Sequence, residues 1–390
     1  MHALRRNFFC VVAVLSVAGS VVCAAEKTPS ADGAAAGATL VYIGTYTGEK
    51  SQGIYVSRLD PATGALSKPE LAAEMINPSW VTIHPNGKFL YAAGESGPYP
   101  GGGGAVSAFS IGSKGQLTML NSQEPNGKGP CHLAIDQTGK TIVVSNYGDG
   151  SMSSLLVGKD GKLAPSAWVD QYPTLGEKQK PHAHHSAFDP SNQFAVTCDA
   201  GLDRIAVYRF DAATGSLTAN DPPFVSTTAE THPRHLTFSL DGRFCYDIDE
   251  KAMSVTAFRF NAKKGKLRQI QAITTLPADF TGKAGSTAEL ILHPSGKFLY
   301  GSNRGPDNIV GYSVDAKSGK LTLIGHTSTL GKTARSFGID PSGQWMIVGN
   351  QNSDTMVQFK IDQTTGELTP TGTKFELGAP VCFQFLAAKR

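Results

Sequence analysis

The chain has 390 residues, with 35 Lys or Arg against 32 Asp or Glu and a formal net charge of +3. So small an excess excludes the broad basic footprint typical of nucleic-acid-binding proteins, and we expect no nucleic-acid partner. The cysteines include no Cys-x-x-Cys pair and the chain has no His-Glu-x-x-His motif. We therefore expect neither a metal nor another cofactor.

Residues 1–25 are typical of a secretory signal peptide. Arg5 and Arg6 precede an apolar run over 8–22, and small residues follow it as a cleavage site. The apolar run is shorter than the roughly 20 residues that a spanning helix needs. Residues 26–39 are rich in small residues and predict a flexible linker. We expect a periplasmic or secreted protein that has no membrane attachment after signal cleavage.

Seven Gly-x-Leu tripeptides mark a repeat along the rest of the chain. Their glycines are Gly64, Gly115, Gly161, Gly215, Gly265, Gly319 and Gly366, at spacings of 46 to 54 residues. This period is typical of the four-stranded blades of a β-propeller. The sequence therefore predicts seven blades.

A second marker runs in phase with the first: a tight turn such as His84-Pro-Asn-Gly87 or Asp340-Pro-Ser-Gly343. Proline presets φ at the first corner of such a turn, and glycine accepts the positive φ of the last. The flanking segments are short and rich in β-branched and aromatic residues, and no long amphipathic helix is predicted. We predict an all-β, seven-bladed propeller over residues 40–390, whose C-terminal strand at 380–385 completes the N-terminal blade.

The turns align the blades, so residues at one offset from the turn glycine should occupy equivalent places. The seventh residues before it are Trp80, His132, His185, His235, Glu289 and Ser336, and the eighth are Ser79, Cys131, His184, Arg234, Ala288 and Arg335. The eighth residues after it are Glu95, Tyr147, Ala200, Glu250, Arg304 and Gln351, with Tyr46 in the first blade, and the seventh include Asp249 and Asn303. Innermost strands line a propeller's channel, so we expect these residues at one mouth of it.

This mixture of histidines, arginines and carboxylates suits the binding and hydrolysis of an anionic or polyhydroxylated ligand. The structural alternative is that these side chains only form hydrogen bonds between blades. The surviving cysteines Cys131, Cys198, Cys245 and Cys382 each fall in a predicted strand of a different blade. We expect them to be buried apolar residues and not a disulfide framework.

Several motifs resemble the lactonase family of seven-bladed propellers, which includes a bacterial 6-phosphogluconolactonase and the fungal carboxy-cis,cis-muconate cyclase. They are Val41-Tyr-Ile-Gly-Thr-Tyr-Thr47, Pro181-His-Ala-His-His185, Pro233-Arg-His235, Asp249-Glu250, Ser302-Asn-Arg304 and Asn350-Gln-Asn352. The resemblance implies a catalytic group of His182 or His184 with Arg234, Glu250 and Arg304. Asp249 and His185 depart from the usual family pattern. Asp249 adds a carboxylate beside Glu250, where like-charge repulsion would raise one pKa.

The sequence thus predicts an exported hydrolase, 6-phosphogluconolactonase-like, that opens a sugar-derived lactone. Glu250 or His184 would take the proton of the attacking water, and Arg234 and Arg304 would stabilise the oxyanion or hold a substrate anion. The predicted substrate-binding residues are His132, His185, His235, Glu289, Arg335, Asn303 and Gln351.

The substrate is expected to be a small lactone, either 6-phosphogluconolactone or an unphosphorylated aldonolactone, and the protein a monomer. Three alternatives stay open. The first is a non-enzymatic propeller that binds a glycan or protein at the channel rim. The second is a muconate-type lactonizing cyclase. The third is metal catalysis through the cluster His182, His184 and His185.

Overall fold

The computed structural model describes residues 37–99, 103–174, 179–283 and 285–388. The predicted signal peptide and most of the predicted linker lie outside the described residues. Within those ranges the secondary structure is almost wholly β, and the single helical element is the short 3₁₀ helix η1 (Gln351–Ser353). No helix of this part of the chain has the length and apolar character needed to cross a membrane.

The strands form seven four-stranded antiparallel sheets, which we number as blades in chain order. Blade 1 contains β28 (Pro380–Leu386), β1 (Thr39–Thr45), β2 (Gly53–Leu59) and β3 (Glu70–Glu74), and blade 2 contains β4 (Pro78–Ile83), β5 (Phe89–Tyr99), β6 (Gly103–Ile111) and β7 (Leu117–Gln123). Blade 3 contains β8 (Pro130–Ile135), β9 (Thr141–Asn146), β10 (Ser151–Val157) and β11 (Leu163–Gln171), and blade 4 contains β12 (Ala183–Phe188), β13 (Phe194–Asp199), β14 (Arg204–Asp211) and β15 (Ser216–Ser226).

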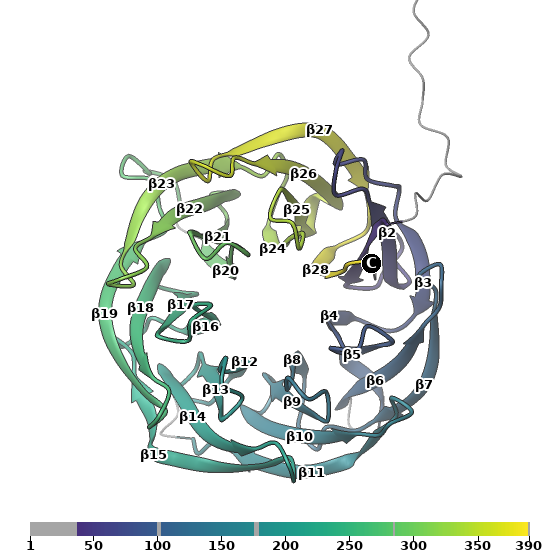
Figure 1. The fold of residues 1–390 in the computed structure, drawn as a ribbon, viewed down its shortest axis with the longest axis vertical. Coiled ribbons are helices and arrows are strands. Elements are labelled where there is room, and N and C mark those ends of the chain that lie inside the picture. The colour runs from purple at the N-terminus through teal and green to yellow at the C-terminus, as the bar shows by residue number, and fades with distance from the viewer. Residues whose placement is uncertain (1–36, 100–102, 175–178, 284, 389–390) are drawn as a thin grey trace, which may run out of the picture. The chain divides into compact units, whose positions relative to one another are not determined.

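The remaining three blades repeat the same order. Blade 5 contains β16 (Pro233–Phe238), β17 (Phe244–Asp249), β18 (Ser254–Asn261) and β19 (Lys266–Thr274), and blade 6 contains β20 (Ser286–Leu292), β21 (Phe298–Arg304), β22 (Asn308–Val314) and β23 (Leu321–Ser328). Blade 7 contains β24 (Ala334–Ile339), β25 (Trp345–Asn350), β26 (Thr355–Ile361) and β27 (Leu368–Glu376). The first strand of each blade lies nearest the centre of the ring (Figure 1).

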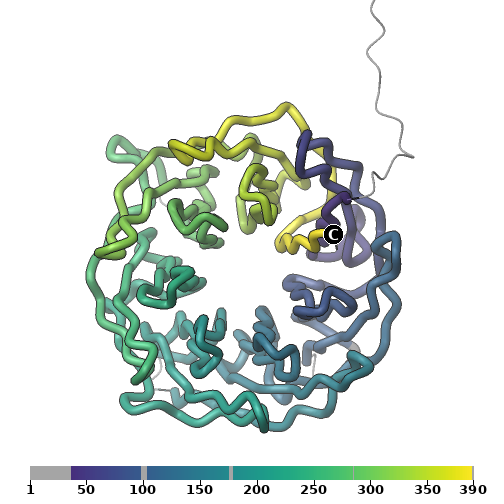
Figure 2. The backbone as a smooth tube through the Cα atoms, viewed as in Figure 1, coloured from purple at the N-terminus to yellow at the C-terminus, as the bar shows by residue number. Residues whose placement is uncertain are grey.

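The ring closes by pairing the two ends of the propeller. The last strand, β28, lies antiparallel to β1 with Leu40 opposite Leu386, and the yellow C-terminal segment lies beside the purple N-terminal strand in Figure 2. This arrangement confirms the predicted closure. It pairs an edge of β1 that would otherwise present unpaired backbone groups.

The repeated glycines occupy the turns between third and fourth strands because their backbone has positive φ there. Gly265 has φ of 61° and Gly319 of 74°. A Cβ atom on Gly319 would also lie 2.2 Å from the ring of Phe244 in the preceding blade. The Gly319 turn therefore packs against its neighbouring blade, and both its positive φ and this close approach favour glycine.

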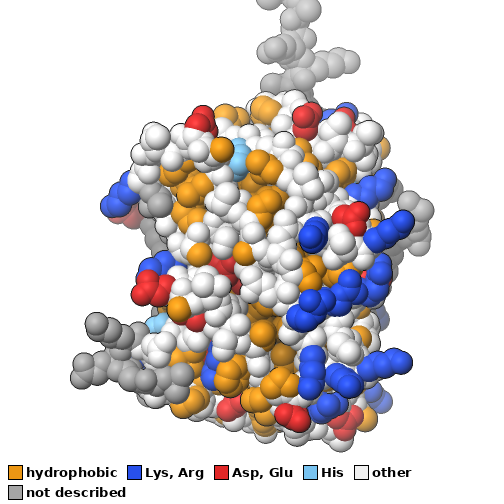
Figure 3. All heavy atoms as spheres, turned by 90° about the vertical axis from the view of Figure 1, so that its left-hand side faces the viewer, with side chains coloured by type: hydrophobic (Ala, Val, Ile, Leu, Met, Phe, Trp, Pro, Cys, Tyr) orange, Lys and Arg blue, Asp and Glu red, His pale blue; other side chains and the backbone are white. Residues whose placement is uncertain are grey.

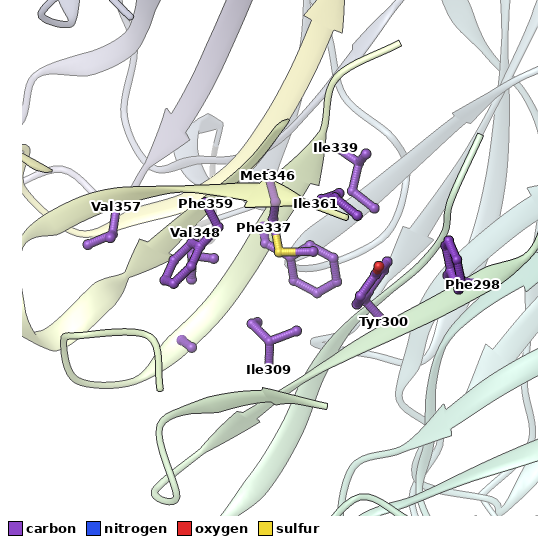
Figure 4. Close-up of a cluster of buried hydrophobic side chains, with 11 residues drawn as sticks. Phe298, Tyr300, Ile309, Phe337, Ile339, Met346, Val348, Val357, Phe359 and Ile361 are labelled. Carbon is purple, nitrogen blue, oxygen red and sulfur yellow. The ribbon is translucent and has the colours of Figure 1, made fainter. Parts of the chain in front are cut away.

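The hydrophobic core is divided among the blade interfaces. Between blades 6 and 7, Phe337, Met346 and Phe359 pack with Phe298 and Tyr300 (Figure 4). The Tyr300 hydroxyl also donates a hydrogen bond of 2.7 Å to the Gly366 carbonyl of the next blade. Apolar burial between successive sheets, supplemented by such bonds, is what holds the ring together.

A β-bulge near the start of each first strand prepares the site. In blade 5 the pairing of β16 with β17 shifts between Pro233 and His235, and blade 4 shows the same shift between Ala183 and His185. A bulge places one extra residue on its strand and interrupts the alternation of faces. His184 and His185 accordingly both approach the ring of His235, at 5.1 and 4.7 Å between centroids.

The four described cysteines are buried and free, as predicted. Cys198 lies in β13 and Cys245 in β17 of the next blade, and no bond joins them. The Cys198 thiol instead lies 3.3 Å from a carboxylate oxygen of Asp247. Burial holds the pKa of both thiols well above the ordinary value, so they are neutral packing residues.

Candidate active site

Glu250 binds two arginines from neighbouring blades. It directly follows β17, and its Oε1 accepts a hydrogen bond of 2.5 Å from Nη2 of Arg304, the last residue of β21. Its Oε2 lies 3.4 Å from Nε of Arg234 in β16. The Thr287 carbonyl accepts a second bond of 2.7 Å from Arg304, and the Ala288 carbonyl accepts one from Arg234. Three of the five predicted catalytic residues are thus in direct contact.

The charges of this trio are fixed by their mutual attraction. Burial raises the pKa of Glu250, but Arg234 and Arg304 lower it by more, so the net pKa lies below its ordinary value. Burial, followed by the like charge of Arg304, lowers the pKa of Arg234 to about 10. All three groups are therefore charged at neutral pH. The Glu250 side chain is 26% exposed and the Arg234 side chain 2%, so the pair is only partly open to solvent.

A second ionic group belongs to the same electrostatic site. Nη2 of Arg335 in β24 lies 4.0 Å from Oε1 of Glu95 in β5, and its guanidinium lies over the ring of Tyr46 at 5.2 Å. The Tyr46 hydroxyl donates a hydrogen bond of 2.9 Å to Glu95. Because Arg335 also contributes to the low pKa of Glu250, blades 1, 2, 5, 6 and 7 all supply polar groups to this rim.

His182 has a defined tautomer. Its Nδ1 lies 2.9 Å from the carbonyl oxygen of Tyr147, and a carbonyl can only accept, so Nδ1 carries the proton and Nε2 presents a lone pair. Asp199 Oδ1 accepts a bond of 2.9 Å from the His182 backbone amide. The imidazole stacks on the Tyr147 ring at 4.6 Å between centroids and 21° between planes. His182 is thereby oriented as a proton acceptor.

His184 lies deeper, in β12. Its ring is 5.5 Å from that of Tyr147, and Nδ1 is buried with no hydrogen-bond partner among the described residues. Burial, and then the charge of Arg234, hold the pKa of His184 well below its ordinary value. This imidazole is neutral at physiological pH.

An aromatic tier formed by Trp80, His132, His185 and His235 fills the channel next to this group. Ring centroids are 4.2 Å apart for Trp80 and His132 and 3.8 Å apart for His132 and His185. Burial, followed by the charges of neighbouring side chains, holds the pKa of all three histidines well below the ordinary value. The aromatic tier is thus an uncharged layer of side chains. Its four residues come from four successive blades, one from each.

Glu289 anchors one end of the aromatic tier. Its Oε1 lies 2.7 Å from Nδ1 of His235 and accepts the Leu290 amide at 3.0 Å, while Oε2 accepts the Ser336 hydroxyl at 3.0 Å. Burial raises the pKa of Glu289. With Nδ1 facing this carboxyl group, His235 turns Nε2 away from Glu289.

Asn303, predicted to bind substrate, has a structural role in the fold, and its contact with substrate stays a prediction. Asn303 is fully buried, and its amide nitrogen donates bonds of 2.8 Å to the Thr275 carbonyl and to Asn308 Oδ1. Side chains alternate along a strand, so the residue before the rim-facing one turns away from the channel. Buried polar residues occupy the same position in other blades: Asn146, Asp199, Asp249 and Asn350. Asn303 and Asn350 at this position bind both within their own blade and to the segment that follows the last strand of the preceding blade.

Asp249, the carboxylate beside Glu250 in the sequence, is bound by hydroxyl groups of its own blade. Its Oδ2 accepts hydrogen bonds from the hydroxyls of Ser254 and Thr256 at 2.7 and 2.8 Å. Burial raises the pKa of Asp249, whereas the pKa of Glu250 is lowered by its arginines. The raised pKa of this pair is thus that of Asp249, and its first cause is burial.

Tyr46, Glu95 and Tyr147 are rim residues that were not among the predicted ligands. They occupy the same offset after the turn as Glu250 and Arg304, so the blade alignment carried the signal. Gln351, at the same offset, begins η1 and is half-buried, and its role stays a prediction. Among the described residues, no three or more His, Cys, Asp or Glu side chains are arranged to hold a metal ion.

The fold and this rim define a class: a seven-bladed propeller with an arginine–carboxylate site at one end of its channel. The sequence model of the family described as Lactonase, 7-bladed beta-propeller, matches residues 40–385. The chain therefore belongs to the lactonase family of seven-bladed β-propellers.

Individual relatives agree with this assignment. The 6-phosphogluconolactonase of Bacillus subtilis is 33% identical over 303 residues, which cover 77% of this chain and 84% of that protein. The 6-phosphogluconolactonase of Formosa agariphila is also 33% identical, over 77% of this chain and 86% of its own length. The solved structure of the periplasmic gluconolactonase of Pseudomonas aeruginosa superimposes with a TM-score of 0.84 at 32% identity, over 90% of this chain and all of that one.

Proposed function

We propose that this lactonase hydrolyses a sugar-derived lactone to its hydroxy acid at the rim formed by Arg234, Glu250 and Arg304. The observation that carries the proposal is the bridging of two arginines from different blades by one carboxylate, at 2.5 and 3.4 Å. Such a bridge holds both guanidiniums in place before substrate arrives. Preorganised donors of this kind stabilise negative charge as it develops in a transition state.

Hydrolysis adds water to the lactone carbonyl and then expels the ring oxygen as an alkoxide that takes a proton. Arg304 and Arg234 would stabilise the tetrahedral oxyanion. Both carboxylate oxygens of Glu250 face guanidinium groups, and the pKa of Glu250 is lowered. Glu250 is therefore better suited to position the arginines than to accept a proton.

The base in this proposal is His182. Its Nδ1 proton is held by the Tyr147 carbonyl, so Nε2 is free to accept a proton from the attacking water and to return it to the leaving alkoxide. His184 is the rival base. It is more deeply buried, and the charge of Arg234 disfavours the imidazolium that proton transfer would form.

The charge of the rim suits a substrate that carries or develops negative charge. Within the part of the chain that the structure describes, the salt bridges of Arg234, Arg304 and Arg335 involve two carboxylates, those of Glu250 and Glu95. The excess positive charge would attract a phosphate or carboxylate as well as the oxyanion itself. Relatives named 6-phosphogluconolactonase support a phosphorylated lactone, and the periplasmic gluconolactonase supports an unphosphorylated one met after export. Given the predicted signal peptide, we favour the unphosphorylated aldonolactone and a periplasmic location.

The test is acid release from glucono-1,5-lactone and 6-phosphoglucono-1,5-lactone, compared with spontaneous hydrolysis. Glu250→Gln removes the charge that holds both arginines, and His182→Asn removes the free imidazole nitrogen. Each should lower kcat at least about a hundredfold. His326→Asn is the matched control, because His326 only contacts the Thr275 carbonyl and should retain activity within about twofold.

Absence of acceleration on every lactone by a folded protein would overturn the proposal. Full activity in His182→Asn with loss in His184→Asn would move the base to His184. A preference for the phosphorylated lactone would contradict the favoured substrate while leaving the hydrolytic site intact.

A further inference from the structure

The Gly-x-Leu turns of blades 5 and 6 carry a charge that the fold does not require. Blade 5 reads Asn261-Ala-Lys-Lys-Gly-Lys-Leu-Arg268, and blade 6 reads Asp315-Ala-Lys-Ser-Gly-Lys-Leu321. The equivalent turn of blade 7 reads Asp362-Gln-Thr-Thr-Gly-Glu-Leu368. All three have the same glycine conformation, with φ between 61 and 77°. The turn thus forms with threonine and glutamate as readily as with lysine.

Contacts between the two blades bring these cations together. The Arg243 guanidinium, from the turn between β16 and β17, donates a bond of 2.7 Å to the Ala316 carbonyl in the blade 6 turn. Arg243 and Arg259 both lie over the ring of Phe244, at 5.4 and 5.2 Å. The same ring packs against Gly319.

We define the basic patch as the exposed charged residues of these turns and strand ends. Its cations are Arg243, Arg259, Lys263, Lys264, Lys266, Arg268, Lys297, Lys317 and Lys320, and its anions are Asp241 and Asp315. The excess of seven positive charges exceeds the formal net charge of +3 of the whole chain. Figure 3, which views the side on which β18, β19 and β23 lie, shows Lys and Arg side chains gathered along one edge of that face.

The two anions do little to neutralise the basic patch. Asp241 pairs with Arg243 at 2.7 Å, and the carboxylate of Asp315 accepts the amide and hydroxyl of Ser318 in its own turn at 2.7 and 2.8 Å. Among the described residues, no salt bridge involves the lysines of the patch. Such unpaired cations are available to an anionic partner.

An exposed hydrophobic side chain, Leu240, belongs to the same turn as Arg243 and lies against Gly296, the residue before Lys297. Leu240 is 64% exposed, the highest fraction among the large hydrophobic residues described. The matching turn position is Pro85, Pro190, Pro294 or Pro341 in four blades and Gln137 in another, so the turn does not need leucine. An exposed apolar residue within a surface rich in Lys and Arg is an arrangement by which proteins adsorb to an anionic bilayer. A surface for single-stranded nucleic acid would instead offer exposed aromatic rings for stacking, and duplex DNA is an arm of the test below.

We propose that the basic patch docks this propeller onto an anionic phospholipid membrane, with Leu240 entering the interface. Arg234 lies near the start of β16, and the turn that contains Arg243 follows the end of this strand. The same turn precedes the start of β17, and Glu250 follows the end of β17. The patch and the active-site rim are therefore at opposite ends of the same strands. Docking leaves the channel mouth open to the aqueous side. This inference is independent of the lactone proposed above.

The test is flotation of the purified chain with vesicles of phosphatidylcholine alone or with 30 mol% phosphatidylglycerol, at low and high salt. The triple variant Lys263→Thr, Lys264→Thr, Lys266→Glu transplants the blade 7 turn into blade 5. Lys159→Thr with Lys162→Glu is the matched control in blade 3, where Asp160 accompanies the lysines. Leu240→Gln borrows the residue of blade 3.

We expect binding only to the anionic vesicles, at least a tenfold loss in the triple variant, a smaller loss in Leu240→Gln, and unchanged binding in the control. High salt should release the protein. The variant and its control both contain residues 1–25, so the difference between them separates the effect of the patch from that of the basic and apolar N-terminal segment. Equal binding to both vesicles, equal losses in variant and control, or binding to duplex DNA without binding to vesicles would each overturn the proposal. As a control for folding, the triple variant should hydrolyse lactone at the rate of the parent chain, which shows that its active-site rim is intact.

Discussion

The rim and the aromatic tier beside it are built from neighbouring residues of the same strands, yet their chemistry is opposite. Arg234 on the rim is charged and paired with Glu250, whereas the next residue, His235, is neutral and stacked among imidazoles. Both are buried. The comparison teaches that a nearby carboxyl group does not by itself keep a buried group charged. Arg234 stays charged beside Glu250, whereas burial and the positive charges of Arg234 and Arg335 keep His235 neutral although Glu289 lies 2.7 Å from its Nδ1.

The largest expected difference between the two regions is in catalysis. Arg304→Lys keeps the charge but removes the rigid guanidinium whose Nη2 donates to both Glu250 and the Thr287 carbonyl. We expect kcat/KM to fall by about two orders of magnitude, because the flexible lysine ammonium is not held in that position. Arg335→Lys should change KM by less than about tenfold, since Arg335 lies 4.0 Å from its partner. Steady-state kinetics of Arg304→Lys and Arg335→Lys test this expectation. Equal losses of kcat/KM in the two variants would contradict it.

The largest expected difference in stability is at Glu289. Glu289→Ala leaves the His235 Nδ1–H and the Ser336 hydroxyl without a buried partner. We expect a loss of about 3 kcal/mol in the free energy of unfolding. Glu95→Ala on the rim is the control, and its half-open position predicts less than about 1 kcal/mol. Urea unfolding measures the loss in unfolding free energy for both variants. Similar losses would show that the aromatic tier does not depend on its side-chain contacts more than the rim does.

Asn303 and Gln351 sharpen the distinction between a buried connector and the rim. Asn303→Ala should cost about 2 kcal/mol of stability, because the Thr275 carbonyl and Asn308 lose a buried donor. KM for the preferred lactone should stay unchanged in this variant. Gln351→Ala should leave stability within about 0.5 kcal/mol. Thermal unfolding and KM are measured for both variants. A raised KM in Asn303→Ala would show that Asn303 contacts the substrate.

The aromatic tier should also make stability depend on pH. The folded-state pKa values of His132, His185 and His235 lie well below the unfolded value of about 6.5. As pH falls below about 6.5, the unfolded chain takes up protons that the folded chain refuses, so stability is complete above that pH and declines below it. Each histidine contributes a slope of up to about 1.4 kcal/mol per pH unit.

His132→Asn should remove one such contribution. The raised pKa of Glu289 changes stability with pH in the opposite direction to the histidines. Because Glu289 is present in both proteins, its contribution cancels when the slope of His132→Asn is subtracted from that of the parent chain. Unfolding free energies at pH 7.5, 6.0 and 5.0 give the two slopes. Identical slopes would mean that His132 keeps its proton in the folded state.

Much of this molecule follows from the repeat in its sequence. Each Gly-x-Leu glycine lies in a turn with positive φ, and the run at 380–386 pairs with β1 as predicted. Local turn chemistry and alternating apolar residues suffice for this, because they specify each blade separately and seven blades complete a ring. The same alignment placed Arg234, Glu250 and Arg304 at one end of the strands.

Only the tertiary structure decided how those residues act. The direction of the Asn303 and Asp249 side chains depends on strand alternation and on partners in other loops, which offsets along the chain do not encode. The low pKa of Glu250 and the neutral histidines depend on which charges meet across blades. The basic patch depends on Arg243 reaching the next blade, whereas composition recorded only a nearly neutral chain. Sequence fixes local conformation, but charge and proximity are properties of the assembled ring.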